Sequence, residues 1–295
     1  MTDQAISSMR REPAILRLIK GAALIRESWV GMVGLGIIVF WAVVALLADV
    51  IAPFPPNATG APMTLPGGPA LDGSGTHWLG TDQLGRDILS RIIHGSRQVL
   101  LYAPLATLCA YAVGIPMGLA AGYRRGLTDD VLSFIANVIL SFPVLVLYII
   151  IIATIGASGI NIIIAVTFAS APGIMRIVRG LVLDLRNREY VFAAETRGES
   201  AWRIMLVEIL PNARGPLIVD GCLRLGYVII TIGTLGFLGL GLPPPDPDWG
   251  KMITEARAFI QFMPHMAIFP CIAISSLVLG FNLLADGLRE VSLRD

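Results

Sequence analysis

Residues 131–155 read VLSFIANVILSFPVLVLYIIIIATI, a run that contains no charged side chain. A helix needs about 20 mostly apolar residues to cross a bilayer, and this run is long enough. The strands of a membrane barrel alternate apolar and polar residues with a period of two. Because residues 144–152 show no such alternation, the run indicates a membrane-spanning helix.

Five further apolar runs lie at residues 30–52, 99–122, 160–178, 216–240 and 265–288. The whole chain is 55% hydrophobic and 15% charged, whereas charged residues approach about 25% in ordinary soluble domains. We therefore predict an all-α integral membrane protein with about six transmembrane helices. The run at 160–178 is the weakest because it is short and Pro172 interrupts it. Pro104, Pro116 and Pro143 are expected to kink their helices.

The basic residues suggest how the chain is oriented. If both ends are cytoplasmic, most lysines and arginines fall on the inner segments, while the outer segments hold Arg86, Arg91, Arg97, Lys251 and Arg257. The positive-inside rule therefore predicts two cytoplasmic termini. The polar residues that precede the first apolar run are too many for a cleaved signal peptide.

The expected division is a cytoplasmic segment (1–29), a first transmembrane helix (30–52), an outer loop (53–97), a five-helix core (98–288) with an inner loop at 179–215, and a cytoplasmic tail (289–295).

The inner loop at 179–215 is long and charged, yet apolar residues recur along it at spacings of three and four. Such spacings place side chains on one face of a helix; here they are Val191, Ala194, Trp202, Met205, Leu206 and Ile209. We predict two short helices joined near Gly198, since glycine permits a sharp turn, with Pro211 ending the second. This element would lie on the membrane surface or dock into a partner protein.

The outer segment that follows the fifth apolar run contains LPPPDPD at residues 242–248. Its prolines exclude a continued helix. Trp249 is expected at the membrane interface, where tryptophan is enriched, and a short helix is expected over residues 252–262.

Several of these stretches together resemble one family. Residues 192–198 read FAAETRG and are followed by Leu210 and Pro211; they resemble the Glu-Ala-Ala-x-x-x-Gly loop of bacterial ABC importer permeases. The segments GTDQLGRDILSRIIHGSR (80–97), FLGLGLPPPDPDWG (237–250) and ESWVGMVGLGI (27–37) are similar to segments of the C-type permease subunits of dipeptide and oligopeptide importers. The similarity covers nearly the whole chain.

The resemblance implies a type I ABC importer permease of the MetI-like fold, multi-pass in the bacterial cytoplasmic membrane, that translocates di- or oligopeptides. Its expected partners are a homologous permease in a heterodimer, two ATPase subunits or domains, an extracytoplasmic peptide-binding protein and the lipid membrane, with no nucleic acid. Relatives carry glutathione or nickel, and no residue decides among these cargoes. The chain itself is expected to bind no cofactor, with ATP and Mg²⁺ on the ATPases. Lys20 and Lys251 close no G-x-x-x-x-G-K-[ST] loop.

The resemblance also assigns an ATPase-coupling loop. Its residues here are Phe192, Ala193, Ala194, Glu195, Arg197, Gly198, Leu210 and Pro211. Phe192 stands where the family has its loop glutamate. If that glutamate makes a polar contact inside the loop, this chain lacks the contact or Glu195 substitutes.

Asp220 and Arg224 lie inside the fifth apolar run, where charged residues are functional candidates. Their spacing puts them on one helix face, either as a structural ion pair or along a possible translocation path. Gly114, Gly118 and Gly122 repeat every four residues, a spacing that favours close helix packing in lipid.

The outer residues Asp82, Arg86 and Asp87 are expected to form local salt bridges rather than to contact substrate. The histidines and cysteines share no metal-ligand or nucleophile–base spacing. We therefore predict no catalytic centre, no metal site and no enzymatic activity. Two rival classes are therefore disfavoured. A secondary transporter would show inverted repeats or several charges at mid-membrane depth, and a membrane enzyme would show a set of catalytic residues; the sequence shows neither.

Overall fold

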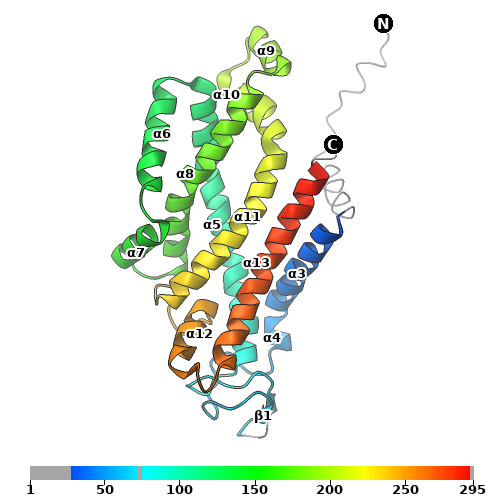
Figure 1. Ribbon diagram of the computed structural model, residues 1–295, viewed down its shortest axis with the longest axis vertical. Helices are drawn as coiled ribbons and strands as arrows, with labels where there is room; N and C mark the ends of the chain where they lie inside the picture. Colours follow the sequence, from blue (N-terminus) through cyan, green and yellow to red (C-terminus); the bar gives the residue numbers. More distant parts are fainter. Residues whose placement is uncertain (1–27, 72, 74, 293–295) are drawn as a thin grey trace.

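The computed structural model describes residues 28–71, 73 and 75–292, which form a bundle of long helices that run roughly along its longest axis (Figure 1). Nearly all of the expected cytoplasmic segment 1–29 lies outside these residues, as does the end of the tail at 293–295. The long helices are α3 (Trp29–Leu46), α5 (Ile88–Arg124), α8 (Gly159–Leu185), α11 (Leu210–Phe237) and α13 (His265–Ser292).

Within the described residues, five helices are long and apolar enough to cross a membrane, and a sixth span results if α6 (Leu127–Leu140) and α7 (Val144–Ile155) are counted together. These two helices meet at 86°, so the run at 131–155 is not one straight helix. The break follows from Pro143, which lacks an amide hydrogen and disfavours helical geometry at the residue before it. The expected bend at Pro143 is thus confirmed. Pro104, Pro116 and Pro172, by contrast, lie inside helices that continue past them.

The glycine repeat of α5 packs against α8. A Cβ atom added at Gly118 would lie 2.5 Å from Val178 Cβ, which is closer than real Cβ contacts. The neighbouring positions repeat this contact: the three glycines Gly114, Gly118 and Gly122 face Ile174, Val178 and Val182 in turn. The packing role predicted from the four-residue spacing is confirmed.

The first span, α3, packs along the last span, α13. The backbone of α13 approaches Gly34 so closely that a Cβ atom there would lie 2.5 Å from Leu284 N. Trp41 Nε1 donates a hydrogen bond to Ser276 Oγ at 3.0 Å. At the start of α3, the Ser28 hydroxyl accepts from Gly31 N at 3.3 Å and donates to Glu290 at 2.9 Å. The first and last spans are therefore joined along their length.

The outer segments cover the opposite end of the bundle from α9 (Glu189–Thr196) (Figure 1). They comprise α4 (Ala48–Ile51), the antiparallel strands β1 (Gly68–Pro69) and β2 (Thr76–His77), α12 (Trp249–Ala256) and a 3₁₀ turn (Arg257–Phe259). Trp249, which was expected at the membrane interface, packs inside the protein and does not face lipid. Trp249 is 1% exposed, because its Nε1 donates to Ile92 O at 3.0 Å and its ring packs 5.0 Å from that of Trp41.

Candidate functional sites

The inner loop forms two short helical segments joined at Gly198, as its periodicity predicts. The first is α9, and the second begins with α10 (Ala201–Arg203). Gly198 has a φ of +74°, its N–H bonds Glu195 O at 2.9 Å, and Glu199 N bonds Ala194 O at 3.2 Å. A glycine in the left-handed conformation, with two hydrogen bonds back to the last turn, is a common helix end, and it ends α9 here.

The second segment does not end at Pro211, which corrects the expectation. A π-helix over Ile204–Ile209 follows α10 and leads directly into α11. Leu210 N bonds Met205 O, five residues back. In a regular α-helix the proline ring would clash with the carbonyl four residues back. The wider π turn shifts those carbonyls, so the helix continues through Pro211 without a break.

The expected coupling-loop residues divide into two groups by their exposure. Ala194 is fully buried with Val191, and both pack against the π-helix in one apolar cluster. The group that faces outward is Phe192, Ala193, Glu195, Arg197, Gly198 and Pro211, with Leu210 half-buried. Trp202 and Leu206 add exposed apolar surface, at 49% and 50%. Of the two adjacent alanines, only Ala193 is therefore available to a partner.

Two glutamates hold this loop in place. The Tyr123 hydroxyl, at the end of α5, donates to Glu195 at 2.9 Å. Glu199 accepts from Arg197 at 2.9 Å and from Arg203 at 3.1 Å, and these arginines hold the pKa of Glu199 below its ordinary value. Glu199 therefore joins two arginines of the loop, a role that the sequence reasoning missed although Arg203 stands four residues after it. Glu195 instead ties the loop to α5.

A second tie joins the loop to α5. The guanidinium of Arg124 lies 5.5 Å from the ring centroid of Trp202, a cation–π geometry. Arg186, just after α8, donates to Tyr123 O at 3.2 Å. Both halves of the loop therefore contact the end of α5.

Asp220 and Arg224 form the ion pair that their spacing predicts. Arg224 Nε donates to Asp220 Oδ2 at 2.7 Å, and their side chains are 20% and 18% exposed. The Tyr111 hydroxyl, on α5, donates to the same carboxylate oxygen. Arg224 also lines a cavity of about 140 Å³ between α5, α7, α8 and α11.

Of the three outer residues, Asp82 and Arg86 form the expected local salt bridge, while Arg86 and Asp87 also contact residues farther along the chain. Arg86 Nε lies 2.6 Å from Asp82 Oδ2, and its Nη2 lies 2.5 Å from Glu255. Asp87 caps α5 by accepting from Ser90 N at 2.7 Å, and lies 2.9 Å from His77 Nδ1. Glu255 was not predicted, because it lies far away in the sequence.

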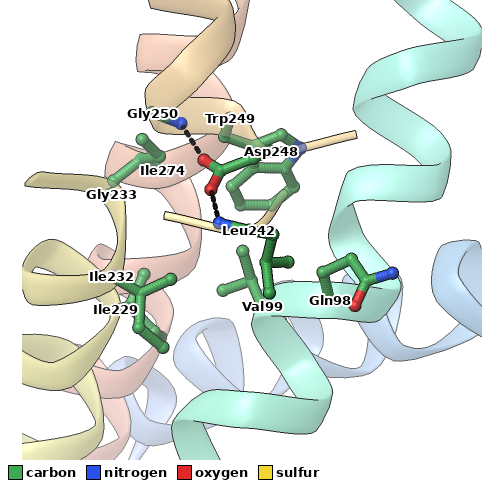
Figure 2. A pocket seen from close by; sticks show the side chains of 10 residues that line it. All are labelled: Gln98, Val99, Ile229, Ile232, Gly233, Leu242, Asp248, Trp249, Gly250 and Ile274. Carbon is green, nitrogen blue, oxygen red and sulfur yellow. Dashed lines mark hydrogen bonds between the residues drawn. The ribbon is translucent and has the colours of Figure 1, made fainter. Parts of the chain in front are cut away.

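Asp248 ties the two ends of the proline-rich segment together through hydrogen bonds to Leu242 and Gly250, as Figure 2 shows. Its carboxylate accepts from Gly250 N at 2.8 Å and from Leu242 N at 3.1 Å. Burial raises the pKa of this carboxyl. The gap beside it measures about 10 Å³, which is about the space of a single water molecule, so the role of Asp248 is to fix the backbone.

Among the described residues, no group of three His, Cys, Asp or Glu side chains could hold a metal ion. The three cysteines are free thiols, with Cys109 and Cys222 half-buried and Cys271 exposed.

The apolar bundle and its five or six candidate spans, counted over the described residues, define an integral membrane protein. The family described as "Binding-protein-dependent transport system inner membrane component" matches residues 114–294, and the chain belongs to it. It is therefore a multi-pass protein of the cytoplasmic membrane and a permease subunit of the ABC importer type. This membership implies ATPase and substrate-binding partners.

Individual proteins support the assignment. The chain is 42% identical over 217 residues to the glutathione transport system permease protein GsiD of Pectobacterium atrosepticum, covering 74% of this chain and 72% of that protein. It is 38% identical to the dipeptide transport system permease protein DppC of Alkalihalophilus pseudofirmus, covering 90% of this chain and 86% of that protein. It is 37% identical to DppC of Haemophilus influenzae, covering 88% of each chain. A solved structure of the MetNI methionine ABC transporter in an inward-facing conformation matches with a TM-score of 0.58 over 69% of this chain and 97% of that one; its 18% identity shows the fold alone.

Proposed function

We propose that this chain translocates di- or oligopeptides across the cytoplasmic membrane, driven by separate ATPase subunits. The observation that carries the proposal is the similarity to DppC and GsiD along most of the chain. Dipeptides and glutathione share peptide bonds and a free carboxylate, so one class of cargo accommodates both.

The proposed assembly contains a second, homologous permease, two ATPase subunits or domains that hold ATP and Mg²⁺, and an extracytoplasmic binding protein. The loop around α9 is the proposed contact with an ATPase. Phe192, Ala193 and Arg197 project from it, and its buried side packs firmly onto the π-helix. A loop tied to α5 through Tyr123 and Arg124 can pass movement of the ATPase to the spans. The chain needs no catalytic centre of its own for this role.

Co-purification tests the coupling surface. The tagged chain is isolated from solubilised membranes as wild type, as Ala193→Asp and as Leu127→Asp. Ala193 faces outward, whereas Ala194 is unsuitable because it is fully buried. Leu127 is 83% exposed at the turn after α5, so its substitution adds the same charge outside the loop. We expect ATPase with wild type and Leu127→Asp but not with Ala193→Asp.

Reconstituted transport tests the cargo. Proteoliposomes that contain both permeases and the ATPases are given the binding protein, ATP and a labelled dipeptide. We expect uptake that requires ATP. If wild type neither retains an ATPase nor needs ATP for uptake, a transporter that works alone is the better account.

A further inference from the structure

The cavity between the spans combines one cation with several hydroxyl groups. Its apolar part consists of Ala110, Ile174 and Val228, and its polar part of Thr107, Tyr148, Ser170, Tyr227, Thr231 and Arg224. At about 140 Å³ it has room for several water molecules, and hence for a small charged group with its neighbouring atoms. Tyr148 and Thr107 are almost fully buried, while Tyr227 is 69% exposed at the rim.

Arg224 is held in place at the edge of the cavity by contacts on both sides. Asp220 accepts from Nε at 2.7 Å, and Tyr111 donates to Asp220 from the far side. Both Nη atoms lie beside Gly173 of α8, at 3.4 and 3.5 Å from the position that a Cβ atom would take there. The missing side chain at Gly173 leaves room for the guanidinium to lie against α8 at the edge of the cavity.

The hydrogen-bond donors that line the cavity select the ligand. Arg224 lines the cavity, whereas Asp220 is not among the lining residues. A guanidinium donates two parallel hydrogen bonds to a carboxylate, and such charge-assisted pairs are strong where water is scarce. Hydroxyl groups can add donors to the same anion. An ammonium group would meet a positive charge instead.

We propose that this cavity binds the terminal carboxylate of a peptide during translocation, with Arg224 as the anchoring residue and Asp220 and Tyr111 as its positioning residues. This inference rests on the proposed peptide cargo. It assigns a polar substrate contact to this subunit.

The test compares uptake of a labelled dipeptide with uptake of its C-terminal amide by the reconstituted transporter. The first variant is Asp220→Asn with Arg224→Gln, which removes both charges together and leaves no unpaired ion in the membrane. The second is Arg224→Lys, which keeps the charge but not the fork of two nitrogens. Arg289→Gln removes an exposed arginine outside the cavity and is the control. Because the binding protein is the same throughout, a change in the ratio of acid to amide uptake reports on the permease.

We expect the ratio of acid to amide uptake to fall about tenfold in the double variant, as loss of about 1.4 kcal/mol implies. It should fall less in Arg224→Lys, and it should stay at the wild-type value in Arg289→Gln. An unchanged ratio in both cavity variants, with peptide still imported, overturns the carboxylate site and leaves the peptide cargo intact. Uptake of the N-acetylated dipeptide is measured alongside, and a change in the variants confined to this peptide, with the acid-to-amide ratio unchanged, overturns the carboxylate site in favour of an amine contact at Asp220. Wild-type vesicles that import no peptide overturn the cargo itself.

Discussion

Phe192 exposes 53% of its surface from α9, outside the membrane spans, and it adjoins the outward-facing Ala193. Large aromatic residues in such places are frequent anchors of protein interfaces. We expect Phe192→Ala to weaken ATPase binding by about 1–2 kcal/mol, roughly five- to thirtyfold in Kd, without lowering the stability of the chain. Titration of the ATPase onto nanodisc-embedded permease measures the effect. Phe262→Ala, which truncates a 79% exposed phenylalanine at the other end of the bundle, should leave binding unchanged. An equal loss in both variants would refute an anchoring role for Phe192.

Asp248 is the residue whose loss should most disturb the outer end of α11. Asp248→Ala removes the acceptors for Leu242 N and Gly250 N in a buried place. We expect the free energy of unfolding to fall by about 1–3 kcal/mol, measured by thermal unfolding in detergent. Asp246→Ala, two residues earlier and exposed, is the matched control. A similar small effect in both variants would mean that the prolines alone hold the segment.

At the scale of the helix, the packing of α5 on α8 leads us to expect opposite effects on stability when two glycines are replaced by alanine. Gly118→Ala places a Cβ atom 2.7 Å from Met175 O as well as against Val178, and we expect a loss of about 1–3 kcal/mol from overpacking. Gly180→Ala, on α8, meets nothing within 4 Å and should gain about 0.5–1 kcal/mol from helix propensity. Thermal unfolding of the two variants should therefore shift in opposite directions from wild type. Equal shifts would show that the glycine repeat is not a packing surface.

Much of this element-level structure could be predicted from sequence, because it depends on local spacing. The glycine repeat, the ion pair Asp220–Arg224 and the turn at Gly198 all follow from periods of three to four residues. Pro143 and Pro211 show the limit. Both lack an amide hydrogen, yet only Pro143 breaks its helix, because a π turn before Pro211 accommodates the proline ring. No residue pattern in the sequence predicts that π turn.

The side-chain partners that sequence could not provide are those brought together by packing. Tyr111 reaches Asp220, Tyr123 reaches Glu195, and Arg86 reaches Glu255 across the fold. Each pair joins different helices or segments, so its spacing along the chain carries no signal. The burial of Ala194 beside Val191, by contrast, agrees with the apolar face that the spacing predicts, and Ala193 lies off that face and is exposed.

At the scale of the molecule, the orientation in the membrane can be tested directly. Leu71 is 79% exposed in the outer segment and Thr196 is exposed at the end of α9, and Figure 1 shows β1 and α9 at opposite ends. In a background with Cys109, Cys222 and Cys271 replaced by alanine, we expect a membrane-impermeant maleimide to label Leu71→Cys in spheroplasts and Thr196→Cys only after permeabilisation. The reverse pattern would place the α9 loop outside the cell.

The helix that runs without interruption over Ala201–Phe237 connects these two ends. It has 37 residues and, at about 1.5 Å per residue, is roughly 55 Å long. One end carries the packing against α9, the other lies beside Asp248, and the contact of Asp220 with Tyr111 falls near the midpoint. If this helix tilts as a rigid rod about that contact, a tilt of about 5° moves its two ends in opposite directions by roughly 2 Å each. Under such a tilt, a displacement of the inner loop would move the end of the helix beside Asp248 in the opposite direction.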